Sequence, residues 1–368
     1  MTQPFAYCPH ADDVLARLRR LFGDRDPQML CAQMDWPNPA LKDFAARHPE
    51  GFCDYPNPKE RIAFWDAFLR ERSRCFDDSV PCAYLSEMDQ GLYGGIVGGE
   101  VEFMSDPGTG WISSMVHPLI DDWAALEALE IDENCEWYRR YRHQLRIFVE
   151  GAAGRFGISH FILINGLNFV FELFGATRTY QELVDNPDMI GRALDFAFEL
   201  NRKVQRTFFE EVEGFAGGTC SNMVQWFPGQ ILTESVDPFH MTSVDYFERW
   251  GREQLERIFA EFDGGVTHIH GNGRHLLEAV STVRGLKAIY LGDDRGYPSA
   301  FDVLPEIRER TGDLPLVVGV DHERFQSALE ESRLVGGVFY KVGGLPGPDE
   351  ANRLMETVRK NRARSSER

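Results

Sequence analysis

The sequence lacks an apolar run near the ~20 residues that a membrane-spanning helix requires. Its first residues also lack the charged and apolar regions of a signal peptide. Positive charge is scarce, because 39 Lys and Arg against 58 Asp and Glu give a formal net charge of -19. Such an acidic chain repels phosphate groups, which argues against nucleic acids and anionic membrane surfaces as partners. We therefore expect a cytoplasmic protein that acts on a small molecule.

Cysteine is present but shows no pairing pattern. The seven cysteines are odd in number and include no C-x-x-C pair, so a disulfide framework is not expected in a chain of 368 residues. The glycine-rich stretch Gly91 to Phe103 lacks the helix that a dinucleotide-binding fingerprint needs directly afterwards. It instead predicts a β-hairpin, and residues 80–118 as a whole predict a flap over a binding site.

Strand and helix patterns alternate along the second half of the chain. Apolar runs near residues 158–165, 215–221, 264–270, 286–292, 314–320 and 336–341 predict six strands, with helical patterns between them. Such alternation indicates a parallel α/β sheet, and one or two strands from residues 80–118 would close a (β/α)8 TIM barrel. We predict an N-terminal helical extension over residues 1–75, the barrel over 76–360, and a frayed tail over 361–368.

The segment from Gly264 to Asp294 carries the strongest chemical signal. It reads as strand, helix and strand, with His268 and His270 near the end of the first strand. Residues two apart on a strand face the same side, so both imidazoles should point into the mouth of the barrel. Neutral imidazoles suit zinc and similar metals. The alternative is that both histidines only form hydrogen bonds to a substrate or to neighbouring groups.

Third metal ligands are sought at the other predicted strand ends. Cys220 is the thiolate candidate, although it can equally be a buried core residue, and the carboxylate candidates are Asp293, Glu234 and Asp321. Asp293 is also the candidate acid or base, while Asp294 is expected to cap a turn. The single histidines His240, His275 and His322 are read as capping or surface residues.

Further residues near strand ends are candidates for substrate contacts. Tyr340 and Lys341 stand at the exit of the last predicted strand, and Asn272 follows the histidine pair. An apolar pocket with a few polar anchors is typical of small-molecule sites. The side chains that could line such a pocket are Tyr84, Trp111, Asn165 and Trp226.

Three stretches resemble the uroporphyrinogen decarboxylase superfamily. Trp226 to Asp237, followed by the helix from Ser243 to Glu261, resembles the family's acidic residue and helix entry. His268-Ile-His-Gly-Asn272 resembles its H-x-C-G-N segment, and Gly336 to Thr357 resembles its last strand, glycine loop and closing helix. The resemblance is loose over most of residues 55–360 and implies a (β/α)8 barrel.

The family contains two activities, and the sequence departs from both. Its porphyrin decarboxylases carry an N-terminal R-Q-A-G-R motif, where this chain has Met34-Asp-Trp-Pro-Asn38. Its zinc methyltransferases pass a methyl group between a corrinoid protein and a thiol, with zinc held by the H-x-C pair and a later cysteine. Here His268 matches the histidine, His270 replaces the first cysteine, and Val342 or Gly343 stands where the later one is expected.

The resemblance implies a metal-assisted methyltransferase that acts with a corrinoid methyl donor on a partner protein. Zinc would sit at His268, His270 and Cys220, while Asn272, Asp293 and Tyr340 would orient the substrate. The second hypothesis is a metal-free decarboxylase of a tetrapyrrole or other multi-carboxylate substrate, anchored by Lys341, Arg295 or Arg274. The third is a binding protein that keeps the barrel without turnover. The sequence does not decide whether the chain forms a homodimer.

Overall fold

The structure, a computed structural model, describes residues 6–49, 57–88, 90–160 and 162–360. The predicted tail 361–368 lies outside this range. The α-helices are α1 (Ala11–Leu18), α2 (Pro39–Arg47), α3 (Pro58–Arg72), α4 (Gly91–Ile96), α5 (Glu136–Ala152), α6 (Leu167–Phe174), α7 (Ala176–Asp185), α8 (Pro187–Glu211), α9 (Val244–Trp250), α10 (Arg252–Ala260), α11 (Leu277–Ser281), α12 (Leu304–Thr311), α13 (His322–Glu330) and α14 (Pro348–Lys360). The strands are β1 (Leu30–Met34), β2 (Cys82–Tyr84), β3 (Val101–Asp106), β4 (Trp111–Val116), β5 (Gly157–His160), β6 (Gly218–Ser221), β7 (Gln225–Pro228), β8 (Leu232–Ser235), β9 (Gly265–Ile269), β10 (Leu286–Leu291), β11 (Leu316–Asp321) and β12 (Val338–Gly343). Shorter helical turns are η1 (Arg19–Gly23), η2 (Ser86–Met88), η3 (Trp123–Ala128), η4 (Asp237–Phe239) and η5 (Gly271–Leu276).

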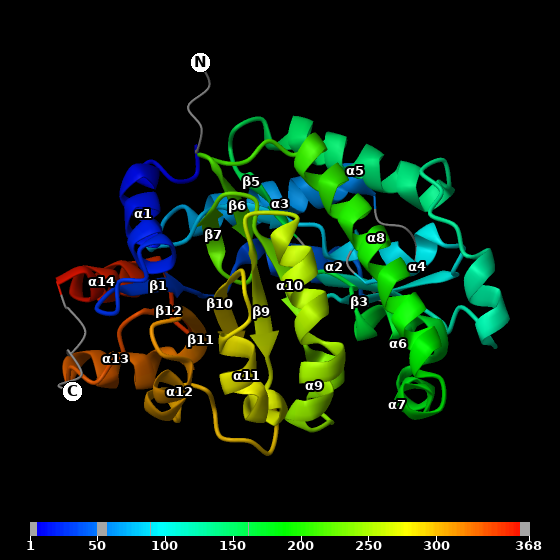
Figure 1. Cartoon of the computed structure of the whole chain (residues 1–368). Coiled ribbons are helices and arrows are strands. Elements are labelled where there is room, and N and C mark those ends of the chain that lie inside the picture. Colours follow the sequence, from blue (N-terminus) through cyan, green and yellow to red (C-terminus); the bar gives the residue numbers. More distant parts are fainter. Residues whose placement is uncertain (1–5, 50–56, 89, 161, 361–368) are drawn as a thin grey trace.

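The predicted α/β architecture with a parallel sheet is confirmed. One sheet has the order β1-β12-β11-β10-β9-β8, and all of its pairs are parallel. A second sheet has the order β2-β5-β6-β7, in which only β7 is antiparallel. A parallel bridge between Ile162 and Thr233 links the two sheets, and helices lie outside the strands (Figure 1).

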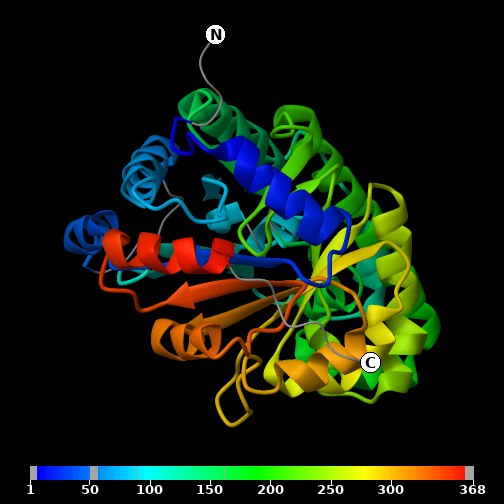
Figure 2. The same cartoon turned by 90° about the vertical axis from the view of Figure 1, so that its left-hand side faces the viewer.

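β1 is a strand that the sequence pattern did not predict. It pairs with β12 from Leu30↔Val338 to Met34↔Val342, and α14 packs against it (Figure 2). Residues within the proposed helical extension therefore take part in the main sheet. The pattern was obscured because the five-residue strand is directly followed by the Trp- and Pro-bearing segment that precedes α2.

The free edge of β1 is satisfied by two buried carboxylates instead of a neighbouring strand. Asp78 accepts from the Ala32 amide at 3.0 Å, and Asp77 accepts from the Met34 amide at 2.8 Å. The Asp78 amide donates in return to the Ala32 carbonyl at 2.9 Å. These bonds join β1 to the segment that leads into β2 and give the edge amides of β1 partners that they would otherwise lack. We call the boundary between β1 and β2, the edge strands of the two sheets, the seam.

Side chains from alternate strand positions enter two different cores. The inner core includes Cys31, Val266, Ala288, Val317 and Phe339. The outer core, packed against the helices, includes Ala32, Ile269, Ile289, Val318 and Tyr340. Strand residues two apart therefore enter the same core.

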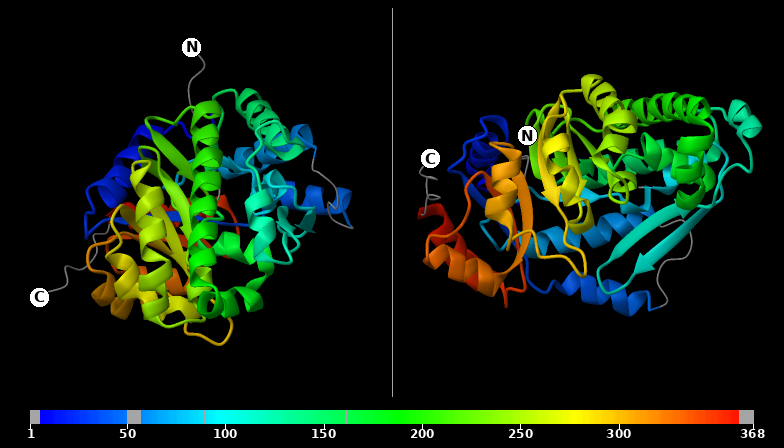
Figure 3. Two further views of the ribbon diagram at one scale, coloured as in Figure 1. Left: turned by 45° about the vertical axis from the view of Figure 1, so that its right-hand side comes forward. Right: turned by 60° about the horizontal axis from the view of Figure 1, so that its bottom comes forward.

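The flap has a different structure from the predicted hairpin. Gly91 to Ile96 forms the short helix α4, and the hairpin is made by β3 and β4, which extend away from the parallel strands (Figure 3). Small residues are needed in α4 because a Cβ at Gly94 would lie 2.4 Å from Val116, and one at Gly91 2.8 Å from Ser114. The glycines therefore allow helix-to-hairpin contact and do not form a turn. No helix in the described part of the chain is long and apolar enough to cross a membrane.

Candidate metal centre

His268 and His270 lie together at the carboxyl end of β9, as the alternation predicted. His268 is buried and pairs in register with Tyr290 of β10, while His270 directly follows the strand. Their ring centroids are 5.1 Å apart. The two imidazoles thus converge at the edge where β8, β9 and β10 end.

Asp237 joins the two histidines from the turn η4, which follows β8. Its carboxylate oxygens lie 3.1 and 3.2 Å from Nε2 of His268. One ligand-capable atom from each of Asp237, His268 and His270 lies within 4.8 Å of the others. The Asp237 side chain is 45% exposed while His268 is buried, so the group has one open side. Open positions of this kind are what catalytic metal sites keep for a substrate.

Asp294 orients His270. Nδ1 of His270 donates to Asp294 at 3.0 Å, and the same carboxylate accepts from the Asn272 amide at 3.2 Å. Although burial raises the pKa of Asp294, these hydrogen bonds lower it below its ordinary value. A histidine that gives one ring nitrogen to a carboxylate presents the other to a metal, and this pairing is common in metal centres.

A third histidine, His240, completes the cluster. Its Nδ1 lies 3.5 Å from Asp237, and its ring centroid is 5.7 Å from that of His270. Burial lowers its pKa to about 4, so the imidazole is neutral at pH 7 and able to bind a metal. Nε2 of His240 is buried without a hydrogen-bond partner among the described residues. Gly273 allows the close approach, because a Cβ there would lie 2.1 Å from the His240 ring.

The cluster keeps Asp237 ionised. Burial raises the pKa of this carboxyl, but His268, His240 and His270 outweigh burial and bring the pKa to about 2. A carboxylate beside imidazole nitrogens is a ligand set that zinc and related divalent ions accept.

Glu234 and Asn165 lie on the outer side of β8, away from the histidines. They border a small pocket together with Gln254 of α10. Burial raises the pKa of Glu234 to about 8, and its Oε2 has no hydrogen-bond partner in the described part of the chain. Glu234 is therefore a neutral acid at pH 7, and we do not count it among the metal ligands.

We expect Glu234 to make folding stability fall with rising pH. Its pKa is raised from 4.5 to about 8, so its contribution is complete below pH 4.5 and is lost as pH approaches 8. Relative to the wild type, Glu234→Gln should gain up to ~1.4 kcal/mol of unfolding free energy per pH unit across this window. Urea unfolding at pH 5, 6, 7 and 8 measures the difference. The exposed Glu253→Gln serves as the matched control, and parallel curves for all three proteins would contradict the assignment.

The structure separates Cys220 and Trp226 from the histidines. Cys220 is buried on β6 in the other sheet, where a Cβ at Gly157 would lie 2.6 Å from its sulfur. Burial raises the pKa of its thiol well above the ordinary value, which disfavours the thiolate. Trp226 fills the same inner core and donates to the Phe215 carbonyl at 2.8 Å. Both residues serve packing, because β6 and β7 direct them into the core and away from the strand ends.

Asp293 and Tyr340 also lie elsewhere than the predicted roles require. Asp293 accepts from the Ala300 amide at 2.6 Å and from Arg274 at 3.3 Å, so it fixes the loop after β10. Tyr340 points into the outer core and donates to the Val335 carbonyl at 2.7 Å. The assignment of Asp293 and Asp294 is thereby reversed, since Asp294 contacts His270. Asp321 caps α13 by accepting from the Arg324 amide at 3.0 Å.

The remaining predicted residues are Lys341, Tyr84, Trp111 and Asn272. Lys341 and Tyr84 line one cavity, and the half-exposed Trp111 lies over Tyr84 with ring centroids 5.0 Å apart. Oδ1 of Asn272 is buried beside the metal cluster without a hydrogen-bond partner among the described residues. These four residues come from β2, the hairpin, the turn after β9 and β12.

Asp237, His240 and Asp294 were not selected as ligands or orienting residues from the sequence. A usable signal exists only for Asp294, which follows a predicted strand, whereas Asp237-Pro-Phe-His240 follows β8, which was not among the predicted strands. Carboxyl ends of neighbouring parallel strands meet at one edge of a sheet, so polar residues there are expected to converge. The order of the strands in the sheet is therefore what selects Asp237, His240 and Asp294 as site residues over His275 and His322.

No family model matches the sequence, and no similar sequence is found among curated proteins. The fold is similar to that of a methyltransferase from Methanosarcina mazei, with a TM-score of 0.62 and 15% sequence identity. The match covers 94% of this chain and 98% of the methyltransferase. At this identity, the likeness shows a shared fold over nearly the whole length and nothing about the reaction.

Proposed function

We propose that this protein is a metal-dependent methyltransferase of the type that the uroporphyrinogen decarboxylase superfamily contains. The observation that carries the proposal is the cluster of Asp237, His268 and His270, with Asp294 behind His270. The fold shared with a methyltransferase is compatible with it.

The residues of the cluster fit a divalent metal, and we propose zinc. Two imidazoles and one carboxylate are a common set of three protein ligands in catalytic zinc sites. Asp237 takes the place of the ligand that Cys220 was expected to supply, and the neutral His240 stands beside it as a further donor. When bound, the metal would lower the pKa of an acceptor thiol and keep it as a nucleophile.

We further propose that the two sheets are parts of one (β/α)8 barrel. The barrel would have eight parallel positions, in the order β1, β2, β5, β6 together with β8, β9, β10, β11 and β12. β6 and β8 share one position, because both lie beside the chain of β5 and the residues that follow it. The Ile162–Thr233 bridge and the hydrogen bonds between Asp78 and Ala32 support closure at the two gaps. In such a barrel the metal cluster lies at the catalytic mouth.

Within this proposal the methyl donor is a corrinoid carried by a partner protein, and the acceptor is a small thiol. The half-exposed Trp111 on the hairpin and Asn272 beside the cluster would contact substrate. The reaction moves a methyl group from cobalt to sulfur, so methyl-cobalamin and a thiolate give a thioether and cob(I)alamin.

A methyl-transfer assay tests the function. Zinc-loaded protein is incubated without oxygen with methylcobalamin and a panel of small thiols, and both cob(I)alamin and the thioether are quantified. We expect product above the protein-free rate, and a loss of at least ~100-fold for His268→Ala with His270→Ala. The exposed His143→Ala on α5 should match the wild type. Metal-loaded protein that gives no thioether with any thiol would refute methyl transfer.

The same protein preparation also tests the two alternative functions, a decarboxylase and a binding protein. Of the cations considered for a decarboxylase, Arg274 is engaged with Asp293 and Arg295 is exposed, whereas Lys341 lines a cavity. Of these three cations only Lys341 lines a cavity, which is a poor match for a tetrapyrrole with several carboxylates, so we expect no consumption of uroporphyrinogen. Tight binding of a ligand that is recovered unchanged would instead favour a binding protein.

A further inference from the structure

A cavity of about 190 Å³ lies at the seam between β1 and β2. Gln33 lines it from β1, Cys82 and Tyr84 from β2, and Lys341 from β12. Such a volume is far above the ~15 Å³ that a single water needs. The apolar part of the lining comes from Trp65, Phe68, Leu69, Val80, Pro81 and Tyr84.

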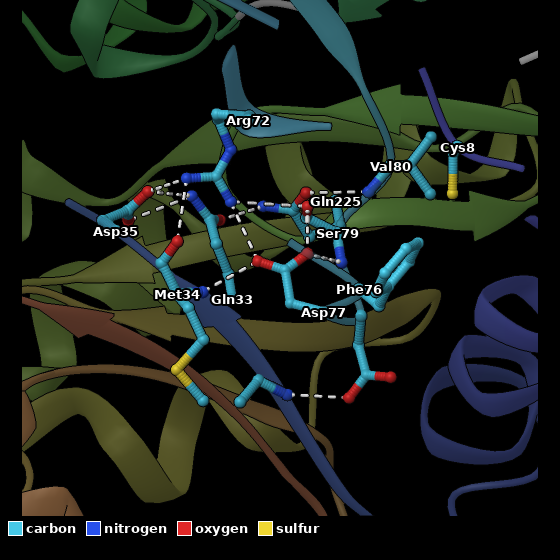
Figure 4. Close-up of polar contacts among 12 residues, drawn as sticks. Cys8, Gln33, Met34, Asp35, Arg72, Phe76, Asp77, Ser79, Val80 and Gln225 are labelled. Carbon is cyan, nitrogen blue, oxygen red and sulfur yellow. Dashed lines mark hydrogen bonds and ion pairs between the residues drawn. The ribbon is translucent and has the colours of Figure 1, made fainter. Parts of the chain in front are cut away.

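Arg72 is the first cation of this cavity, and its charge is already balanced. The guanidinium extends between Asp35 and Asp77, as Figure 4 shows, and also donates to the Met34 carbonyl at 3.0 Å. The distance from Arg72 to Asp77 is 2.9 Å. Two carboxylates thus surround one guanidinium, and Arg72 leaves no net positive charge for a ligand.

The amide side chains at the cavity bind one another. Gln225 donates to Gln33 at 2.5 Å and accepts from the Val80 amide at 3.2 Å. Gln33 donates in turn to Asp35 at 3.0 Å. These hydrogen bonds hold both glutamine side chains in place at the cavity, and each side-chain amide nitrogen already donates to a protein oxygen.

Lys341 is the second cation and has no carboxylate partner among the described residues. Its Nζ donates to the Asn222 carbonyl at 2.6 Å and lies 5.0 Å from the Tyr290 ring centroid. No carboxylate of the described chain lies within ion-pair distance, and an ammonium with one acceptor still has two N–H groups to give. Space is open beside it, because a Cβ added to Gly319, its register partner on β11, would meet no other described residue within 4 Å.

We propose that this cavity binds a small monocarboxylate with an apolar or aromatic body, whose carboxylate pairs with Lys341. The ammonium of Lys341 contacts no carboxylate among the described residues and has N–H groups left to donate, so it can pair directly with one carboxylate of a ligand. Asp77 repels a dianion such as phosphate more strongly than a monoanion, while the aromatic and aliphatic walls suit an apolar body. The proposal does not rest on the metal cluster, which lies at β8, β9 and β10.

Binding should depend on the charge of Lys341. Burial lowers the pKa of its ammonium to about 8, so the cation is present at pH 6.5 and lost as pH rises through 8. Asp35 and Cys82 raise this pKa and Arg72 lowers it, and burial keeps the Cys82 thiol neutral with a pKa of about 12. Other titratable groups of the lining or next to Lys341 are Tyr7, Cys8, His10, Cys75, Asp77, Tyr84 and Tyr290.

Isothermal titration with benzoate and hexanoate tests the site, with benzamide as the neutral match for benzoate. At pH 6.5 we expect benzoate to bind at least ~10-fold more tightly than benzamide, as a charge-assisted hydrogen bond implies. The preference should be absent in Lys341→Met, be retained in Lys341→Arg, and fall in the wild type between pH 7 and 9. His10→Gln should keep the same pH dependence.

The experiments distinguish failure of the carboxylate site from failure of the methyltransferase proposal. Absence of binding by both acids, equal binding of benzoate and benzamide, or unchanged preference in Lys341→Met would overturn the carboxylate site. Thermal unfolding and zinc content of Lys341→Met should match the wild type, which shows that the variant is folded and that its metal cluster is intact. If the wild type retains no zinc after loading but still binds benzoate through Lys341, only the proposal of a metal-dependent methyltransferase is contradicted.

Discussion

Changing His268 and His270 together to alanine is expected to remove a bound divalent metal completely. The wild type, incubated with zinc and then dialysed, should retain about one ion per chain, because three protein ligands with an open position hold zinc in catalytic sites. The double variant keeps only Asp237 and His240, which cannot compete with buffer. Elemental analysis by mass spectrometry gives the stoichiometry directly.

A substitution at Asp294 is expected to weaken zinc binding only partly. Asp294→Asn removes the charge that fixes the His270 tautomer at 3.0 Å while keeping the shape of the side chain. We expect zinc affinity to fall by ~10–100-fold without loss of the ligands, as for other residues that orient metal-binding histidines. His143→Ala is the control. A wild type without metal, or a double variant with unchanged zinc content, would refute the assignment of the cluster.

The second large effect is expected at Asp78, which binds the edge of β1 at the seam. Its buried carboxylate accepts from Arg17 Nε at 2.6 Å and from the Ala32 amide at 3.0 Å, while Arg17 also donates to the Leu30 carbonyl. Asp78→Ala leaves the partly buried Arg17 and the β1 edge without this acceptor. Removing one partner of a buried ion pair costs about 3–5 kcal/mol.

Urea unfolding of Asp78→Ala, followed by circular dichroism, measures this loss. Asp302→Ala is the matched control, because Asp302 forms an exposed ion pair with Arg324 and such pairs contribute at most about 1 kcal/mol. Asp78→Asn should fall between the two, since the amide oxygen can still accept from Ala32. A cost for Asp78→Ala no larger than that of Asp302→Ala would show that the seam is held by other contacts.

Much of the fold could be predicted because its signals are local. The apolar runs at β9, β10, β11 and β12 are buried strands, and the helical patterns between them supply the parallel connections. β1 escaped prediction because a five-residue strand beside Trp36 and Pro37 has too little length for its pattern to stand out. The glycines of α4 were misread because close packing and tight turns call for the same residue.

The candidate site divides in the same way. The sequence by itself determined that His268 and His270 share a face, because the period of a strand is two and any register keeps them together. The same rule places the neighbours Tyr340 and Lys341 on opposite sides of their strand, so the prediction that both contact the substrate was inconsistent with strand geometry.

Only the tertiary structure decided which of those sides is enclosed. The register of β12 between β1 and β11 directs Tyr340 to the helices and Lys341 to the cavity. Likewise, Asp237, His240 and Asp294 come from loops after different strands, and their meeting at His268 and His270 follows from strand order, not from spacing along the chain. Strand geometry is a property of nearby residues, whereas the choice of neighbours depends on how the whole chain packs.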